Sequence, residues 1–122
     1  MIRQTIFLAL LLLGACTGNR SAGDGKPVVT VSILPQKYFV EQIAGDRISV
    51  NVMIPPGASP ATYEPSPSQL EKLSRSDLYF RIGHIGFESA WMEKIRQVNP
   101  GMEVVDLSRH LDLITLEAHE GH

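Results

Sequence analysis

The chain has 122 residues and a formal net charge of −2, from 11 basic and 13 acidic side chains. This near balance leaves no basic stripe of the kind that binds nucleic acid, so we expect no nucleic-acid partner. Residues 27–122 are enough for one small domain with a single core.

The amino-terminal end carries the features of a secretory signal. Arg3 precedes an apolar run over residues 6–13, and small residues follow before Cys16, the only cysteine in the sequence. The run is too short for a transmembrane helix, so residues 1–15 are expected to be a signal peptide. The segment LGAC that ends at Cys16 resembles a bacterial lipobox, which would make Cys16 a lipid anchor outside the cytoplasm. The alternative is an ordinary cleaved signal followed by an unrelated cysteine.

The rest of the chain alternates between strand-like and helix-like patterns. Residues 16–26 are polar and rich in glycine, which predicts a flexible tether ahead of the domain at residues 27–122. Four runs have the length and composition of strands, and we expect them at residues 28–34, 46–54, 77–82 and 102–107. Helices are expected at residues 36–44, from Pro67 onward, and at residues 87–98. This order predicts an α/β layer fold with a parallel sheet.

The connection at residues 55–68, PPGASPATYEPSPS, is stiff. Proline fixes φ and lacks an N–H donor, so this stretch forms neither a helix nor a central strand. Ser66 is the expected N-cap of the next helix, Pro67 its first residue and Gln69 its third, which completes a capping box. The proline loop and the turn GHIG at residues 83–86 both follow strands. We therefore expect both at the carboxyl edge of the sheet, the usual binding edge.

Histidines are the candidate metal ligands. His84 lies between the turn's glycines, where it is either a neutral ligand facing a cleft or a turn residue facing water. His119 and His122 stand among glutamates, a mixture that suits zinc, although a solvated tail is the alternative. His110 is expected at the surface and not as a ligand. No phosphate loop, nucleophile elbow or carboxylate pair beside a nucleophile is present, so we expect no enzyme activity.

Three stretches together carry a family resemblance: the lipobox, the segment SILPQKYFVEQIAGDRISVNVMIPPGASPATYEPSPSQLEKLSRSDLYFRIG, and the helix FESAWMEKI. They resemble the N-terminal lobe of the zinc and manganese solute-binding lipoproteins of bacterial ABC transporters, over residues 28 to about 113. The resemblance implies two α/β lobes joined by a long rigid helix. One transition-metal ion would bind between the lobes and pass to an ABC permease. Zinc is the expected ion, while manganese or iron(II) would fit a site richer in carboxylates.

The sequence departs from this family in two ways. The family's proline loop reads Gly-x-x-Pro-His-x-Tyr, with the histidine as a ligand, whereas Ala61 stands at that position here. The family's second ligand histidine falls just after the third strand, which implies a ligand role for His84. The turn that contains His84 is, however, one residue longer than is common in the family. Relatives continue through a histidine-rich acidic loop into a second lobe, so the chain is expected to end inside that loop without its C-terminal lobe.

Two functions remain open at this point. The resemblance implies a membrane-anchored lipoprotein of the periplasm or cell surface that binds a metal ion for import. The alternative is a surface adhesin or interaction lipoprotein that uses the same scaffold and binds metal weakly or not at all. The presence of Ala61 at the ligand position favours this alternative modestly.

Overall fold

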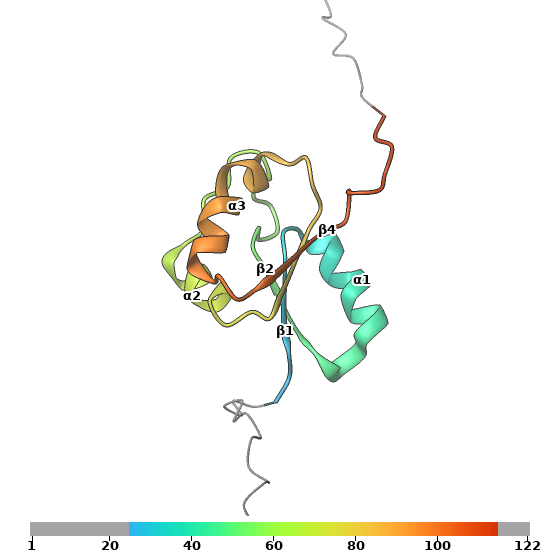
Figure 1. Cartoon of the computed structure of the whole chain (residues 1–122), viewed down its shortest axis with the longest axis vertical. Helices are drawn as coiled ribbons and strands as arrows, with labels where there is room; N and C mark the ends of the chain where they lie inside the picture. The colour runs from blue at the N-terminus through green and yellow to red at the C-terminus, as the bar shows by residue number, and fades with distance from the viewer. Residues whose placement is uncertain (1–24, 115–122) are drawn as a thin grey trace, which may run out of the picture.

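The computed structural model describes residues 25–114, which place a parallel sheet between layers of helices (Figure 1). The strands are β1 (Val28–Val31), β2 (Ser49–Val52), β3 (Leu78–Arg81) and β4 (Glu103–Asp106). The helices are α1 (Leu34–Ala44), the short 3₁₀ helix η1 (Gly45–Arg47), α2 (Pro67–Leu73) and α3 (Gly86–Val98). The expected order of strands and helices is present, so the predicted α/β class is confirmed.

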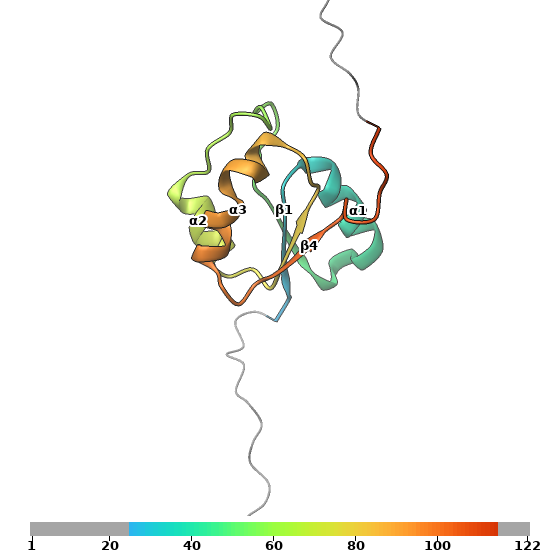
Figure 2. The same cartoon turned by 45° about the horizontal axis from the view of Figure 1, so that its top comes forward.

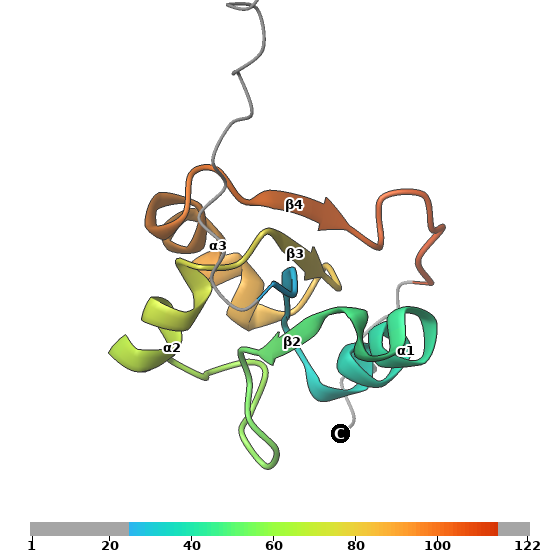
Figure 3. The same ribbon diagram turned by 90° about the horizontal axis from the view of Figure 1, so that it is seen from below.

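The path of the chain explains the layers. The sheet order is β2-β1-β3-β4, and every neighbouring pair is parallel. The connection from β1 to β2 moves in one direction across the sheet, and the two later connections move in the other. Because such crossovers are right-handed, reversing direction places the helices on opposite faces. Figures 1 and 3 show α1 alone on one face, with α2 and α3 together on the other.

The main core lies between the sheet and the pair α2 and α3. Its buried members are apolar or aromatic: Met53, Ile54, Leu73, Tyr79, Phe87, Met92, Ile95 and Met102. Trp91 is half-buried and packs against this cluster. Phe80 is also half-buried, but it faces α1 and lies outside this core. The α2 and α3 side of the sheet is therefore well covered.

The start of α2 agrees with the predicted capping box. The Ser66 hydroxyl accepts a hydrogen bond from the Gln69 backbone N–H at 3.4 Å, and the Gln69 side-chain oxygen accepts one from the Ser66 N–H at 2.9 Å. Pro67 begins the helix, where its missing N–H would have no partner in any case. These residues fix the direction in which the proline loop enters the helix.

Helix α1 begins earlier than predicted, at Leu34 instead of residue 36. The strand expected at residues 28–34 ends at Val31, and Pro35 lies in the first turn of the helix, which its fixed φ suits. The Gln36 side chain secures this start, because its oxygen accepts hydrogen bonds from the N–H groups of Ser32 and Ile33, both at 3.1 Å. A backbone connection of two residues therefore suffices between β1 and α1.

Helix α1 is followed by a glycine and leaves apolar side chains exposed. Gly45 follows the helix with φ 61°, a conformation that glycine adopts readily, as expected from its position after the helical pattern. The apolar spacing of Phe39, Val40 and Ile43 correctly predicts a helix, yet Ile43 remains 81% exposed.

No helix in residues 25–114 has the length and apolar character needed to cross a membrane.

Candidate functional site

The proline loop between β2 and α2 is held at both ends by one side chain. The side-chain oxygen of Gln69 accepts a hydrogen bond from the Tyr63 hydroxyl at 2.6 Å, in addition to the N–H of Ser66. The amide nitrogen of Gln69 donates to the Met53 carbonyl at 2.7 Å. The predicted capping residue therefore has a second role, because it ties the loop's entrance to its exit.

The proline loop and the turn at residues 83–86 meet at the carboxyl edge, as the order of elements predicts. The Phe87 N–H donates to the Pro60 carbonyl at 2.8 Å. Gly86 lies so close to Ala61 that a Cβ atom on it would approach the Ala61 carbonyl oxygen to 2.8 Å. The position at which the family carries a histidine thus lies against the turn that contains His84.

His84 occupies this turn in a left-handed conformation with φ 57°, and its side chain is exposed. Histidine adopts this conformation more readily than most non-glycine residues. An exposed imidazole at a binding edge is accessible to a metal ion and to water alike. The geometry therefore leaves both interpretations of His84 open.

Of the other histidines and the cysteine considered in the sequence, the structure describes only His110. His110 is exposed, as expected, in the segment after β4. Cys16, His119 and His122 lie outside residues 25–114. Within that range no group of three or more His, Cys, Asp and Glu side chains could hold a metal ion. A closed zinc site normally has four ligands, so these residues alone do not form one.

A fully buried carboxylate beneath the turn escaped the sequence analysis. Glu88, near the start of α3, accepts hydrogen bonds from the backbone N–H of Ile82 at 2.8 Å and of Gly83 at 2.7 Å. It also accepts a hydrogen bond from the Ser32 hydroxyl and one from Arg81 Nε at 3.3 Å. One side chain therefore connects the ends of β1 and β3 to α3, directly below the His84 turn.

Further buried polar side chains lie along the sheet. The Tyr79 hydroxyl is hydrogen-bonded to the Ser32 hydroxyl at 2.8 Å, and burial raises the pKa of Tyr79 well above its usual value. The phenol therefore keeps its proton at neutral pH. Thr30 and Ser76, also buried, pair through their hydroxyls. Thr30 in β1 and Ser32 just after it thus find hydrogen-bond partners across the sheet and do not weaken the core.

The end of β4 closes over the same turn. Asp106 Oδ1 accepts hydrogen bonds from the Ser108 N–H at 2.9 Å and the Ser108 hydroxyl at 2.7 Å, and Arg81 Nε lies 3.6 Å from Asp106 Oδ2. The Ser108 bonds, with a smaller contribution from Arg81, lower the pKa of Asp106. Gly83 has φ 83°, and a Cβ atom on it would overlap the Ser108 side chain. Glycine is thus required here for both conformation and space.

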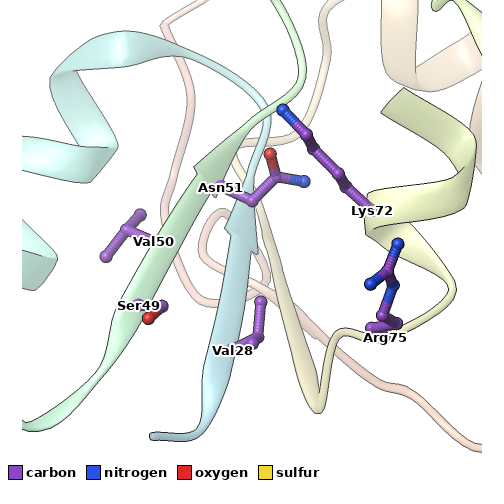
Figure 4. A pocket seen from close by; sticks show the side chains of 6 residues that line it. All are labelled: Val28, Ser49, Val50, Asn51, Lys72 and Arg75. Atoms are coloured by element: carbon purple, nitrogen blue, oxygen red, sulfur yellow. The ribbon is translucent and has the colours of Figure 1, made fainter. Parts of the chain in front are cut away.

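A pocket of about 410 Å³ lies away from this edge, beside the amino-terminal ends of β1 and β2. Figure 4 shows Lys72 of α2 and Arg75, just after that helix, facing the strands across it, with Ser49 and Asn51 on β2. Its charged lining residues are both cations, and none of its lining residues is a histidine, cysteine or carboxylate. Cationic walls disfavour a metal ion, so the carboxyl edge remains the better candidate site.

Comparison with known proteins places the chain among metal-uptake proteins. Residues 29–122 match the family described as zinc-uptake complex component A, periplasmic. The manganese-binding lipoprotein MntA of Halalkalibacterium halodurans is 32% identical over 121 residues, covering 95% of this chain and 39% of that protein. The iron ABC transporter substrate-binding lipoprotein MtsA of Streptococcus pyogenes serotype M1 is 36% identical over 121 residues, covering 91% and 38% respectively.

Solved structures agree with the sequence comparison. A crystal structure of ZnuA matches with a TM-score of 0.70 and 41% sequence identity, over 75% of this chain and 35% of that chain. The chain therefore spans somewhat more than a third of the length of the relatives it matches. These names describe proteins for zinc, manganese or iron, so the metal differs among similar chains.

Proposed function

The chain belongs to the zinc-uptake complex component A family, and from this membership we propose that it is a metal-binding lobe of an extracytoplasmic lipoprotein that serves an ABC importer. Its relatives include substrate-binding lipoproteins of metal ABC transporters, which bind solutes for transport and are not enzymes. The observation that carries the proposal is the meeting of the proline loop with the His84 turn at the carboxyl edge. These two loops would form one wall of a metal site.

Capture of the ion would require only ligand exchange. The exposed His84 imidazole would replace one water molecule bound to the metal ion, and that water would be released to solvent. The two rigid loops would hold the imidazole at a fixed position. Residues from elsewhere in the protein would complete the coordination, and His119 and His122 are our candidates. The ion would then be passed to a membrane permease. No covalent bond to carbon forms or breaks while the ion is captured and delivered.

We propose zinc as the ion. Imidazole is a favoured zinc ligand, and His84 is exposed in the turn at the carboxyl edge. The family description names zinc, and the ZnuA structure has 41% identity to this chain. Manganese and iron(II) remain the competing ions, because similar proteins carry their names.

Attachment to the membrane is a further part of the proposal. Residues 1–15 would be removed as a signal peptide, Cys16 would carry the lipid, and residues 16–26 would serve as the tether to the lobe at residues 27–122. Relatives named as lipoproteins support this arrangement. The adhesin alternative is less favoured, because these relatives are named for metal binding or metal transport.

Zinc binding by the full chain tests the role of His84. We expect calorimetric titration to show zinc binding that weakens about tenfold or more in His84→Ala, because loss of one ligand removes at least about 1.4 kcal/mol. His110→Ala is the matched control, since His110 is also exposed and is not expected to be a ligand. Equal zinc affinity in the wild type and His84→Ala would remove His84 from the site.

A further inference from the structure

The turn that carries His84 has a backbone conformation that one of its residues does not favour. Gly83 has φ 83° and His84 has φ 57°, so two consecutive residues lie in the left-handed region. Glycine enters this region without steric cost, whereas histidine enters it at a cost because of its Cβ atom. Such a conformation persists only where the surrounding structure enforces it. The turn must therefore be held by contacts with other residues.

The buried carboxylate of Glu88 holds the backbone immediately before His84. Its Oε1 accepts a hydrogen bond from the Ile82 N–H at 2.8 Å, and its Oε2 accepts one from the Gly83 N–H at 2.7 Å. One carboxylate thus binds two successive backbone N–H groups, one with each oxygen. Hydrogen bonds to an ionised acceptor are stronger than those between neutral groups. Because Glu88 is fully buried, water does not compete for them.

Glu88 is itself fixed in place. It is the third residue of α3, whose first turn lies beside the end of β3 where the chain turns back (Figure 2). The Ser32 hydroxyl donates a hydrogen bond to Oε1, and Arg81 Nε donates one to Oε2 at 3.3 Å. The carboxylate therefore cannot move without breaking hydrogen bonds to several parts of the chain, and it gives the turn a rigid reference point.

The other contacts of the turn hold only its two ends. The Phe87 N–H donates to the Pro60 carbonyl after the turn, and the Leu107 N–H donates to the Arg81 carbonyl before it. Among residues 25–114, no hydrogen bond other than the one to Glu88 reaches the backbone of Gly83 or His84. The conformation of the middle of the turn thus depends on Glu88.

We propose that Glu88 is a positioning residue for the His84 metal ligand, because its carboxylate holds the turn in the conformation that presents the imidazole at the carboxyl edge. This inference rests on the proposed role of His84 in metal binding. A ligand that is already held in place loses little conformational freedom when it binds an ion, whereas a mobile ligand loses more. Glu88 therefore strengthens metal binding without touching the ion.

Zinc titration of the full chain with Glu88→Gln tests this role. Glutamine has nearly the same volume, but its side-chain amide accepts through one oxygen only, so one of the two N–H groups loses its acceptor. We expect calorimetry to show zinc binding weakened about threefold to tenfold. Glu93→Gln makes the same change at an exposed position of α3 and should leave the zinc affinity unchanged. Unchanged affinity in Glu88→Gln as well would overturn the proposal.

The same substitution in the His84→Ala background separates positioning from a general loss of stability. A residue that acts through His84 has no effect on zinc affinity once the imidazole is gone, so Glu88→Gln should cause no further loss there. An equal loss in both backgrounds would show that Glu88 does not act through His84. If His84→Ala alone binds zinc as tightly as the wild type, the proposed metal site is wrong, and this inference falls with it.

Hydrogen exchange in the unaltered full chain needs no variant, so it decides the question even if Glu88→Gln fails to fold. We expect NMR to show that the Gly83 amide exchanges about 100-fold or more slowly than the adjacent His84 amide, which has no hydrogen-bond partner among residues 25–114. Similar exchange at the two amides would show that Glu88 does not hold the turn.

Discussion

At the scale of single residues, the carboxyl edge depends on a carboxylate that does not face it. Glu88 is fully buried, and its two oxygens accept from two backbone N–H groups, a hydroxyl and Arg81. A buried charge is tolerated only when such partners replace the lost water. The hydrogen bonds to Ile82 and Gly83 hold the backbone immediately before His84. The exposed histidine thus stands on a rigid base.

Replacing Glu88 with alanine should destabilise the fold strongly. The change leaves the N–H groups of Ile82 and Gly83 without their side-chain acceptor, and Ser32 and Arg81 each without one partner. We expect a loss of about 3 kcal/mol or more in the free energy of unfolding, measured by urea denaturation. Glu93→Ala, at an exposed position of the same helix, should change it by less than about 0.5 kcal/mol. Equal losses would show that the buried hydrogen bonds contribute little.

At the scale of secondary structure, the accuracy of prediction depended on how local each signal is. The start of α2 was predictable because Ser66, Pro67 and Gln69 act within one turn. The role of Glu88 was not, because it depends on how the end of β3 and Ser32, which is distant in sequence, are placed around the start of α3. A weak signal was present, however: Glu88, Met92 and Ile95 follow helical spacing, and all three are buried.

The candidate site, too, was predictable only in part. The order of strands and helices correctly predicts that the proline loop and the His84 turn share an edge. It does not predict their close contact, which depends on the absence of a side chain at Gly86. The exposure of α1 was also unpredictable, because helical spacing of Phe39, Val40 and Ile43 indicates an apolar stripe without saying what covers it.

The contact between the two loops can be tested at Gly86. A Cβ atom there would lie 2.8 Å from the Ala61 carbonyl oxygen, so Gly86→Ala should push the proline loop away from α3. We expect a loss of about 1–3 kcal/mol in the free energy of unfolding, which is typical of overpacking. Gly101→Ala is the matched control, because a Cβ atom at Gly101 meets open space. If Gly86→Ala is as stable as this control, the loops are not held in contact.

At the scale of the whole molecule, the two faces of the sheet are covered unequally. The face toward α2 and α3 holds the apolar core and the buried polar group around Glu88. The face toward α1 leaves a groove of about 210 Å³ open between α1, β3 and Leu107. Cooperative stability must therefore come mainly from the first face, together with the loop ends that close it. Asp106 belongs to these loop ends, since it joins β4 to Ser108 and lies near Arg81.

Acid should weaken the whole domain partly through Asp106, whose pKa is lowered in the folded state by hydrogen bonds from Ser108 and by Arg81. A carboxyl group with a lowered folded pKa stabilises the fold above its unfolded pKa, near 3.9, and this contribution disappears as the pH falls through the folded value. Asp106→Asn should therefore lower Tm at neutral pH, and its difference from the wild type should shrink below about pH 4. Thermal melts monitored by circular dichroism would measure this. Asp46→Asn, which removes the same charge from η1, is the control. A deficit in Asp106→Asn that stays constant with pH would show that the ionised carboxylate is not the stabilising form.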